Sequence, residues 1–170
     1  MNTKLLAAIA AAALLSACAS EDTSGAVTGA GAGSGMGAGS GMAGSVRPGS
    51  QEDLVANVGD RVFFATDRST VAADQRPVLE RQAAWLAQYP QVQVTLEGHA
   101  DERGTREYNF SLGARRAQAV NDYLATRGIG ANRMRTVSYG KERPVAVCND
   151  ISCWSQNRRA VIVLDRGAGA

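Results

Sequence analysis

The sequence predicts an α/β two-layer sandwich in which helices pack on one mixed sheet. The segment 91–97 (QVQVTLE) alternates strictly between polar and apolar residues, which is the pattern of a half-buried strand. The segments 71–89 and 108–127 repeat their apolar residues at three- and four-residue steps, which indicates amphipathic helices. With further strands before and after them, the order β-α-β-α-β-β favours helices layered on one sheet.

The first half of this order depends on short segments and two prolines. Residues 61–65 (RVFFA) combine aromatic and β-branched side chains, which predicts the first strand. The helix at 71–89 has Pro77 in its first turns, where proline is tolerated. Pro90 ends that helix, so the strand at 91–97 follows it directly.

The second half starts with the helix at 108–127, which ends at Gly128, a typical C-cap residue. Residues 135–138 are the predicted third strand. The apolar run 160–164 (AVIVL) predicts a well-buried fourth strand. The segment 141–157 shows neither the helical nor the strand period, so we expect an irregular loop there.

The N-terminus (1–17) has the features of a secretion signal. Lys4 supplies positive charge, and the apolar run that follows is shorter than the roughly 20 residues that a membrane span needs. The sequence Leu-Ser-Ala-Cys ending at Cys18 resembles a lipobox, which implies lipidation of Cys18 and cleavage before it. An ordinary signal peptide with a chance cysteine is the alternative. Ala19, where inner-membrane lipoproteins often carry Asp, implies by the same resemblance an outer-membrane anchor.

Residues 18–52 have the composition of a lipidated N-terminus followed by a flexible linker. The stretch 29–44 contains only Gly, Ala, Ser and Met, so it cannot bury enough apolar surface to offset its ordering entropy. A tether of about 30 such residues has a root-mean-square span of about 30 Å. A glycine-rich repeat structure is the alternative, but the pattern is irregular. We therefore predict one folded domain, at 53–167.

The composition argues against several function classes. The formal net charge is +2, and loss of Lys4 with the signal leaves 17 basic residues against 16 acidic ones, so no nucleic-acid partner is expected. His99 is the only histidine and no Ser-His-Asp motif is recognisable, so we expect neither catalytic residues nor a cofactor. We expect His99 to be a hydrogen-bonded structural residue and not a metal ligand.

Cys148 and Cys153 remain once Cys18 is assigned to lipid. An even pair of cysteines in an oxidising compartment predicts a disulfide. It would close a small loop and so remove little entropy from the unfolded chain. Two free thiols are one alternative. A metal pair is the other, but the sequence has no second cluster of Cys or His to complete a site.

The helix at 108–127 carries a charge within its apolar side. Arg116 lies on the row of Leu112, Val120 and Leu124, at four-residue spacing. A buried guanidinium is costly unless it is paired, so Arg116 either pairs with an internal acid or awaits an anionic ligand.

Asp101 lies in the loop that leads to this helix, so its carboxylate and the Arg116 guanidinium can face one cleft. This pair suits a zwitterion, because the carboxylate takes an ammonium group and the guanidinium binds a carboxylate through two parallel hydrogen bonds. An internal Asp101–Arg116 salt bridge is the alternative, and spacing alone does not exclude it.

Four motifs occur in order: EGHADERGT at 97–105, YNFSLGARRAQAV at 108–120, SYGKERP at 138–144 and QNRRA at 156–160. Together they resemble the OmpA-like C-terminal domain family, in its branch of peptidoglycan-associated lipoproteins, over roughly residues 62–164. The resemblance implies a non-catalytic outer-membrane lipoprotein that binds the diaminopimelate of peptidoglycan stem peptides, with Asp at the position of Asp101 and Arg at that of Arg116.

The resemblance also implies three further site residues: Asp67, Asn109 and Leu112. A helix-start hydrogen bond for Asn109 and core packing for Leu112 are their alternatives. The family often has two acids after the first strand, but this chain has Ala65 at the first position, which puts a contact there in doubt. The implied second partner is a TolB-like periplasmic β-propeller protein of the Tol system, which acts in cell division.

Overall fold

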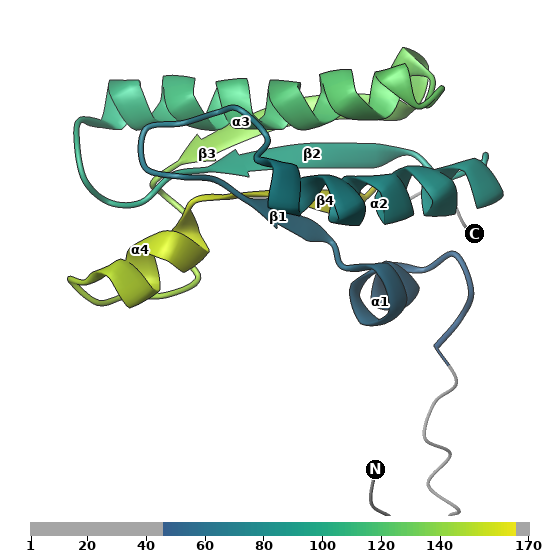
Figure 1. Ribbon diagram of the computed structural model, residues 1–170, viewed down its shortest axis with the longest axis horizontal. Coiled ribbons are helices and arrows are strands. Elements are labelled where there is room, and N and C mark those ends of the chain that lie inside the picture. The colour runs from purple at the N-terminus through teal and green to yellow at the C-terminus, as the bar shows by residue number, and fades with distance from the viewer. Residues whose placement is uncertain (1–45, 166–170) are drawn as a thin grey trace, which may run out of the picture. The chain divides into compact units, whose positions relative to one another are not determined.

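Four strands form one mixed sheet: β1 (Arg61–Phe63), β2 (Val94–His99), β3 (Met134–Gly140) and β4 (Arg159–Leu164). The structure is a computed structural model and describes residues 46–165. The strand order is β1-β4-β2-β3 (Figure 1). β2 and β3 run parallel, whereas β4 is antiparallel to both β1 and β2. The predicted α/β sandwich with a mixed sheet is confirmed.

Two helices pack on this sheet, α2 (Arg76–Gln88) and α3 (Arg106–Thr126). The short turn η2 (Ala73–Gln75) precedes α2, and η3 (Ala131–Arg133) follows α3. The hydroxyl of Thr105 caps the start of α3 by accepting a hydrogen bond from the Tyr108 amide at 3.2 Å. Gly128 follows the end of α3 with a φ of +88°, as expected for a C-cap glycine.

The core lies between the helices and one face of the sheet. Alternate strand residues point into it, such as Val94 and Leu96 of β2, while Thr95 and Glu97 are only half-buried. The helices contribute the side chains that the apolar periodicity predicts. The fully buried members are Leu54, Val62, Leu79, Leu86, Val94, Leu96, Ala117, Val120, Leu124 and Ile162.

Two short helices were not predicted. Helix α1 (Gln51–Asp53) continues into the π-helical turn η1 (Leu54–Val58) before β1. Helix α4 (Ile151–Asn157) lies inside the segment that was expected to be an irregular loop. A helix of seven residues is too short to show the helical period, but Asp150 caps its start by accepting from the Ser152 amide at 2.7 Å.

A disulfide joins Cys148, just before α4, to Cys153 in the first turn of that helix, and the two Cα atoms are 5.7 Å apart. The predicted signal peptide (1–17), Cys18 and most of the predicted linker lie outside the described residues. None of the helices in the described part is long and apolar enough to cross a membrane.

Helix α3 approaches strand β2 most closely where Gly98 faces Gly113. A Cβ added to Gly98 would overlap the Gly113 carbonyl group, whose carbon would lie 2.6 Å away. A Cβ added to Gly113 would lie 2.8 Å from the Gly98 carbonyl oxygen. Only two glycines allow the two backbones to come this close.

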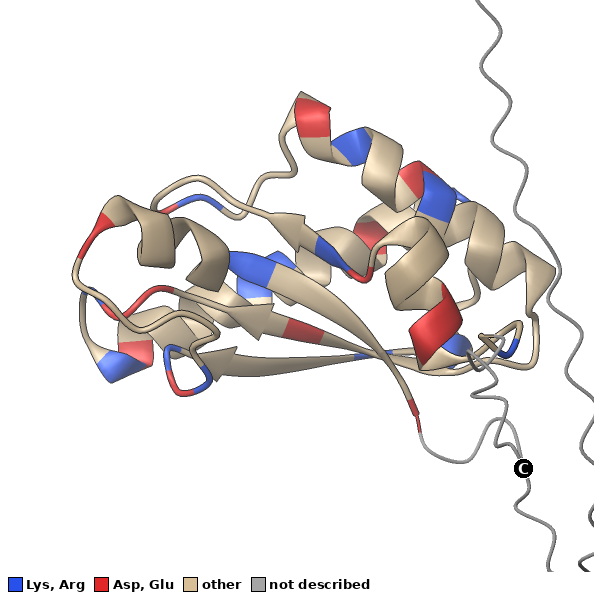
Figure 2. Ribbon diagram, turned by 90° about the horizontal axis from the view of Figure 1, so that it is seen from below, with Lys and Arg blue, Asp and Glu red and all other residues tan. Residues whose placement is uncertain are grey.

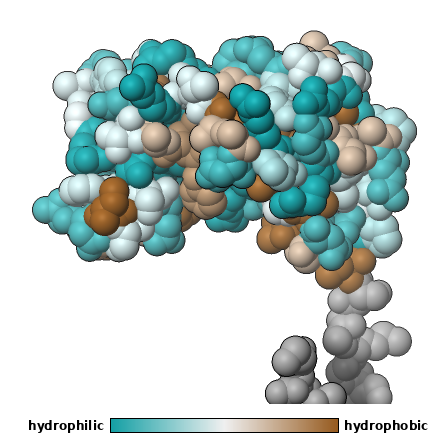
Figure 3. Space-filling view, viewed as in Figure 1, coloured by the Kyte–Doolittle hydropathy of each residue, from teal (hydrophilic) through white to brown (hydrophobic). Residues whose placement is uncertain are grey.

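The strand directions bring the segments that follow β1 and β2 to one edge of the sheet. Both strands are antiparallel to β4, so they run in the same direction. The segments after β1 and β2 therefore meet the start of β4 there, and α4 lies at the same end (Figure 1). Basic and acidic residues are interspersed over the described elements (Figure 2), and apolar side chains reach the face seen in Figure 3 in small separate patches.

Candidate functional site

A small cleft of about 210 Å³ lies at this edge of the sheet. Its walls come from the turn after β1, the loop after β2 and the first turn of α3. The lining residues are Thr66, Asp67, Asp101, Arg103, Gly104 and Tyr108. The cleft thus contains two acids, Asp67 and Asp101, that the sequence had singled out.

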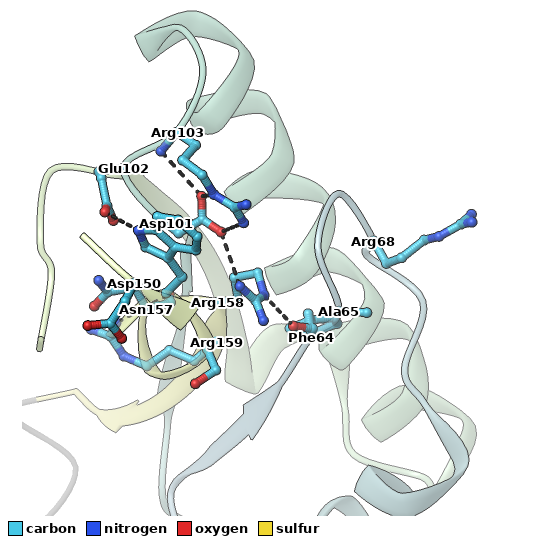
Figure 4. Close-up of polar contacts among 12 residues, drawn as sticks. Phe64, Ala65, Arg68, Asp101, Glu102, Arg103, Asp150, Asn157, Arg158 and Arg159 are labelled. Atoms are coloured by element: carbon cyan, nitrogen blue, oxygen red, sulfur yellow. Dashed lines mark hydrogen bonds and ion pairs between the residues drawn. The ribbon is translucent and has the colours of Figure 1, made fainter. Parts of the chain in front are cut away.

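Asp101 lies between two arginines that were not included in the predicted site (Figure 4). Arg103 Nη2 donates to Asp101 Oδ2 at 2.7 Å, and Arg158 Nη1 donates to the same oxygen at 3.2 Å. Burial alone would raise the pKa of the Asp101 carboxyl, but the hydrogen bonds from Arg103 and Arg158 outweigh it and hold the pKa below its usual value. The carboxylate is therefore charged at neutral pH.

Arg116 is fully buried, as its place on the apolar row predicted. Its guanidinium donates to three backbone carbonyls, those of Arg68 at 2.9 Å, His99 at 2.7 Å and Ala65 at 3.1 Å. Burial, helped by the nearby charge of Arg158, lowers the pKa of Arg116 to about 10, so it stays protonated at neutral pH. Within the described residues Arg116 has no salt bridge with Asp101, which was the alternative left open by the sequence.

Of the other three predicted residues, Asp67 lines the cleft, whereas Asn109 and Leu112 are buried in α3. Asp67 is exposed and has a φ of +54°, which is uncommon for a residue with a side chain. Asn109 is buried, and its amide Nδ2 donates to the Arg103 carbonyl at 2.8 Å, so it braces the loop that carries Asp101. Leu112 is buried too.

A larger hollow of about 620 Å³ lies beside the first turns of α3, against the end of β3. Its walls include the exposed Phe110 and the ion pair Arg106–Glu142, with an Nε–Oε1 distance of 3.1 Å. Glu107 and Lys141 also line this hollow, and none of its four charged side chains is buried, unlike Asp101 and Arg116 beside the smaller cleft. Among residues 46–165, no group of His, Cys, Asp and Glu is placed to hold a metal ion.

His99 is buried, and its ring makes no hydrogen bond to the described residues. Neither ring nitrogen has a partner within the described residues, and the nearest carboxylate oxygen, Glu97 Oε2, is 3.6 Å from Nε2. The expected side-chain hydrogen bond is therefore wrong. Burial, together with the charges of Arg159 and Arg143, lowers the pKa of His99 to about 3.

The low pKa of His99 predicts a pH-dependent stability. Below pH 6.5 the His99 imidazole binds a proton in the unfolded chain, whereas in the folded protein the same imidazole stays uncharged until about pH 3. His99 therefore does not reduce the free energy of unfolding above pH 6.5. As the pH falls from 6.5 toward 3, this one histidine lowers the free energy of unfolding by at most about 1.4 kcal/mol per pH unit. Urea unfolding between pH 6.5 and 5 should show a steeper loss for the wild type than for His99→Gln. Equal slopes would contradict this prediction.

The comparison with known proteins agrees with this architecture. The model of the OmpA family matches residues 63–158, which include the last residue of β1, every residue that lines the cleft, and α4. A peptidoglycan-associated lipoprotein of Rhizobium meliloti is 66% identical over 128 residues, which cover 75% of this chain and 72% of the relative. The chain therefore belongs to the OmpA family, in its group of peptidoglycan-associated lipoproteins, as the sequence motifs indicated.

Solved structures show the same fold. The crystal structure of the peptidoglycan-associated lipoprotein from Burkholderia pseudomallei has a TM-score of 0.61 and 42% identity, and the match covers 62% of this chain and 90% of that one. The C-terminal domain of Helicobacter pylori MotB has a TM-score of 0.60 over 64% of this chain and 86% of that one, at 24% identity. The second likeness concerns the fold alone.

Proposed function

We propose that this chain is an outer-membrane lipoprotein that binds peptidoglycan non-covalently and links the outer membrane to the cell wall. Its membership among the peptidoglycan-associated lipoproteins supports this function. The observation that carries the proposal is the charged carboxylate of Asp101 in the wall of an open cleft, with the Arg116 guanidinium buried next to the same loop. The chain acts by binding and not by catalysis.

The proposed ligand is the diaminopimelate residue of the stem peptide, whose amino-acid centre is a zwitterion. Asp101 takes its ammonium group. Arg116 uses three of its five N–H donors on backbone carbonyls, so two remain, the number that a bidentate carboxylate needs. Arg116 has no exposed surface, so in this proposal the ligand carboxylate reaches these donors when the turn at residues 65–68, whose Ala65 and Arg68 carbonyls accept from the guanidinium, moves aside. Asp67 lines the rim of the cleft.

Asn109 and Leu112 act from behind the cleft in this proposal. Asn109 fixes the backbone of Arg103, and Leu112 lies one helical turn before Arg116 on the same side of α3. Both residues therefore support the site from behind, and neither is among the residues that line the cleft.

The remaining parts of the proposal concern location and partners. Lipid on Cys18 holds the protein in the outer membrane, and the domain faces the periplasm. A TolB-like β-propeller protein is the second partner, within a Tol-Pal system that supports envelope integrity and outer-membrane constriction in cell division. The membership in the OmpA family and the predicted lipobox support this assignment.

Loss of the Asp101 charge tests the proposed function. Asp101→Asn keeps the shape of the side chain but removes the partner of the ammonium group, so binding should weaken about 10- to 100-fold, since a hydrogen bond to a charged group is worth about 1.5–3 kcal/mol. Co-sedimentation of the purified protein with insoluble peptidoglycan measures this. Circular dichroism must show the native spectrum, because Asp101 also pairs with the buried Arg158.

Asp122→Asn is the matched control, because Asp122 is exposed on α3 and its carboxylate accepts a hydrogen bond only from Gln118 among the described side chains. The control should sediment like the wild type. A wild-type protein that stays in the supernatant would overturn the wall-binding proposal and leave a protein partner as the leading function. A folded Asp101→Asn variant that sediments normally would remove Asp101 from the site.

A further inference from the structure

We propose that Arg103 occupies the ammonium position at Asp101 when no ligand is bound, so that ligand binding exchanges one cation for another. This inference rests on the proposed function and deepens it. It makes Arg103 the residue that sets the affinity of the site for a cationic ligand.

All acceptor positions of the Asp101 carboxylate are filled. Oδ1 accepts from the backbone amide of Arg103 at 3.3 Å and from its Nε at 3.2 Å. Oδ2 accepts from Arg103 Nη2 at 2.7 Å and from Arg158 Nη1 at 3.2 Å. A carboxylate has about four acceptor sites, so an arriving ammonium group gains Asp101 only if one of these donors leaves.

Arg103 is the partner that is free to leave. The Arg158 side chain is only 9% exposed, and its Nε also donates to the Phe64 carbonyl at 3.0 Å, so it is anchored in the fold. The Arg103 side chain is 41% exposed and lines the cleft itself. Solvent screens the Arg103 end of this ion pair, although Asp101 itself is buried, so a ligand ammonium group is able to replace the Arg103 guanidinium.

The surroundings of Arg103 allow its side chain to move while its backbone stays. Asn109 holds the Arg103 carbonyl, and Lys141 Nζ donates to the carbonyls of Glu102 at 3.2 Å and Gly104 at 2.7 Å. The Arg103 guanidinium lies 4.1 Å from the ring centre of Trp154 on α4, a cation–π contact that does not depend on Asp101. The released guanidinium therefore keeps a favourable place on α4, next to the cleft.

Titration of the purified full chain with two soluble stem peptides tests the exchange. Both peptides contain diaminopimelate, one with its side-chain ammonium group free and the other with that group acetylated. Arg103→Gln should bind the free peptide about three- to fivefold more tightly than the wild type, because the solvent-exposed guanidinium of Arg103 no longer competes for the Asp101 carboxylate. The acetylated peptide should bind both proteins equally.

Arg115→Gln is the matched control, because it removes the same charge from an exposed site whose side chain bonds only to Ser111 among the described residues. It should behave like the wild type with both peptides. If Arg103→Gln binds the free peptide no more tightly than the wild type does, the exchange is overturned and the proposed function stands. If the wild type binds neither peptide, the proposed function fails and the exchange fails with it.

Discussion

Alanine at position 98 is expected to destabilise the protein by about 3 kcal/mol or more, at the upper end of what overpacking costs. The new Cβ would overlap the Gly113 carbonyl and lie 3.2 Å from the Cβ of Ala117, so α3 would have to move away from β2. That movement would loosen the helix that carries Arg116 and Asn109. Urea unfolding followed by circular dichroism measures the loss.

The facing substitution, Gly113→Ala, separates a side-chain clash from a backbone clash. Its Cβ would meet the Ser138 hydroxyl as well as the Gly98 carbonyl. Ser138→Ala should therefore restore part of the stability lost in Gly113→Ala but none of that lost in Gly98→Ala.

The control for both glycines is Gly128→Ala. Gly128 has a left-handed φ of +88° but no atom within 4 Å of an added Cβ, so it isolates the conformational cost of about 1 kcal/mol. If Gly98→Ala proves no more destabilising than this control, the tight contact between α3 and β2 does not hold in solution.

The sequence predicted the larger elements because their apolar periods are long enough to read. The strand at 91–97 and the helix at 108–127 correspond to β2 and α3, with ends shifted by a few residues. Helix α4 was missed because its seven residues expose Ile151 and bury Cys153, which gives no apolar stripe. A capping signal was present, since Asp150 comes directly before it.

The candidate site was predictable in part. The Arg116 position was read correctly as buried, because its row on the helix is otherwise apolar. Its partners were not predictable, since three backbone carbonyls from distant segments meet it only in the folded chain. Likewise, the pairing of Asp101 with Arg158, 57 residues away, follows from the antiparallel placement of β4 beside β2. The only sequence signal for this pairing is the pair of adjacent arginines in the QNRRA motif, Arg158 and Arg159.

Replacement of Arg116 by alanine is expected to cost about 3–5 kcal/mol of stability, as for other large buried side chains that lose their polar partners. The three carbonyls that the guanidinium satisfies would lose their donor, and a cavity would open between α3 and the turn at 65–68. The His99 carbonyl is the most affected, because its hydrogen bond to Nη1 is fully buried. The urea midpoint of Arg116→Ala measures this.

Arg115→Ala is the matched control for stability, because Arg115 precedes Arg116 in α3 but is exposed, and it should change the free energy of unfolding by about 0.5 kcal/mol or less. Similar midpoints for the two variants would show that the carbonyl contacts do not support the fold. Arg116→Lys then separates stability from binding, because it keeps the charge but cannot present two parallel donors. If Arg116→Lys folds but releases the diaminopimelate peptide, Arg116 binds the ligand carboxylate; if it folds and binds normally, Arg116 only supports the turn and the loop that form the cleft.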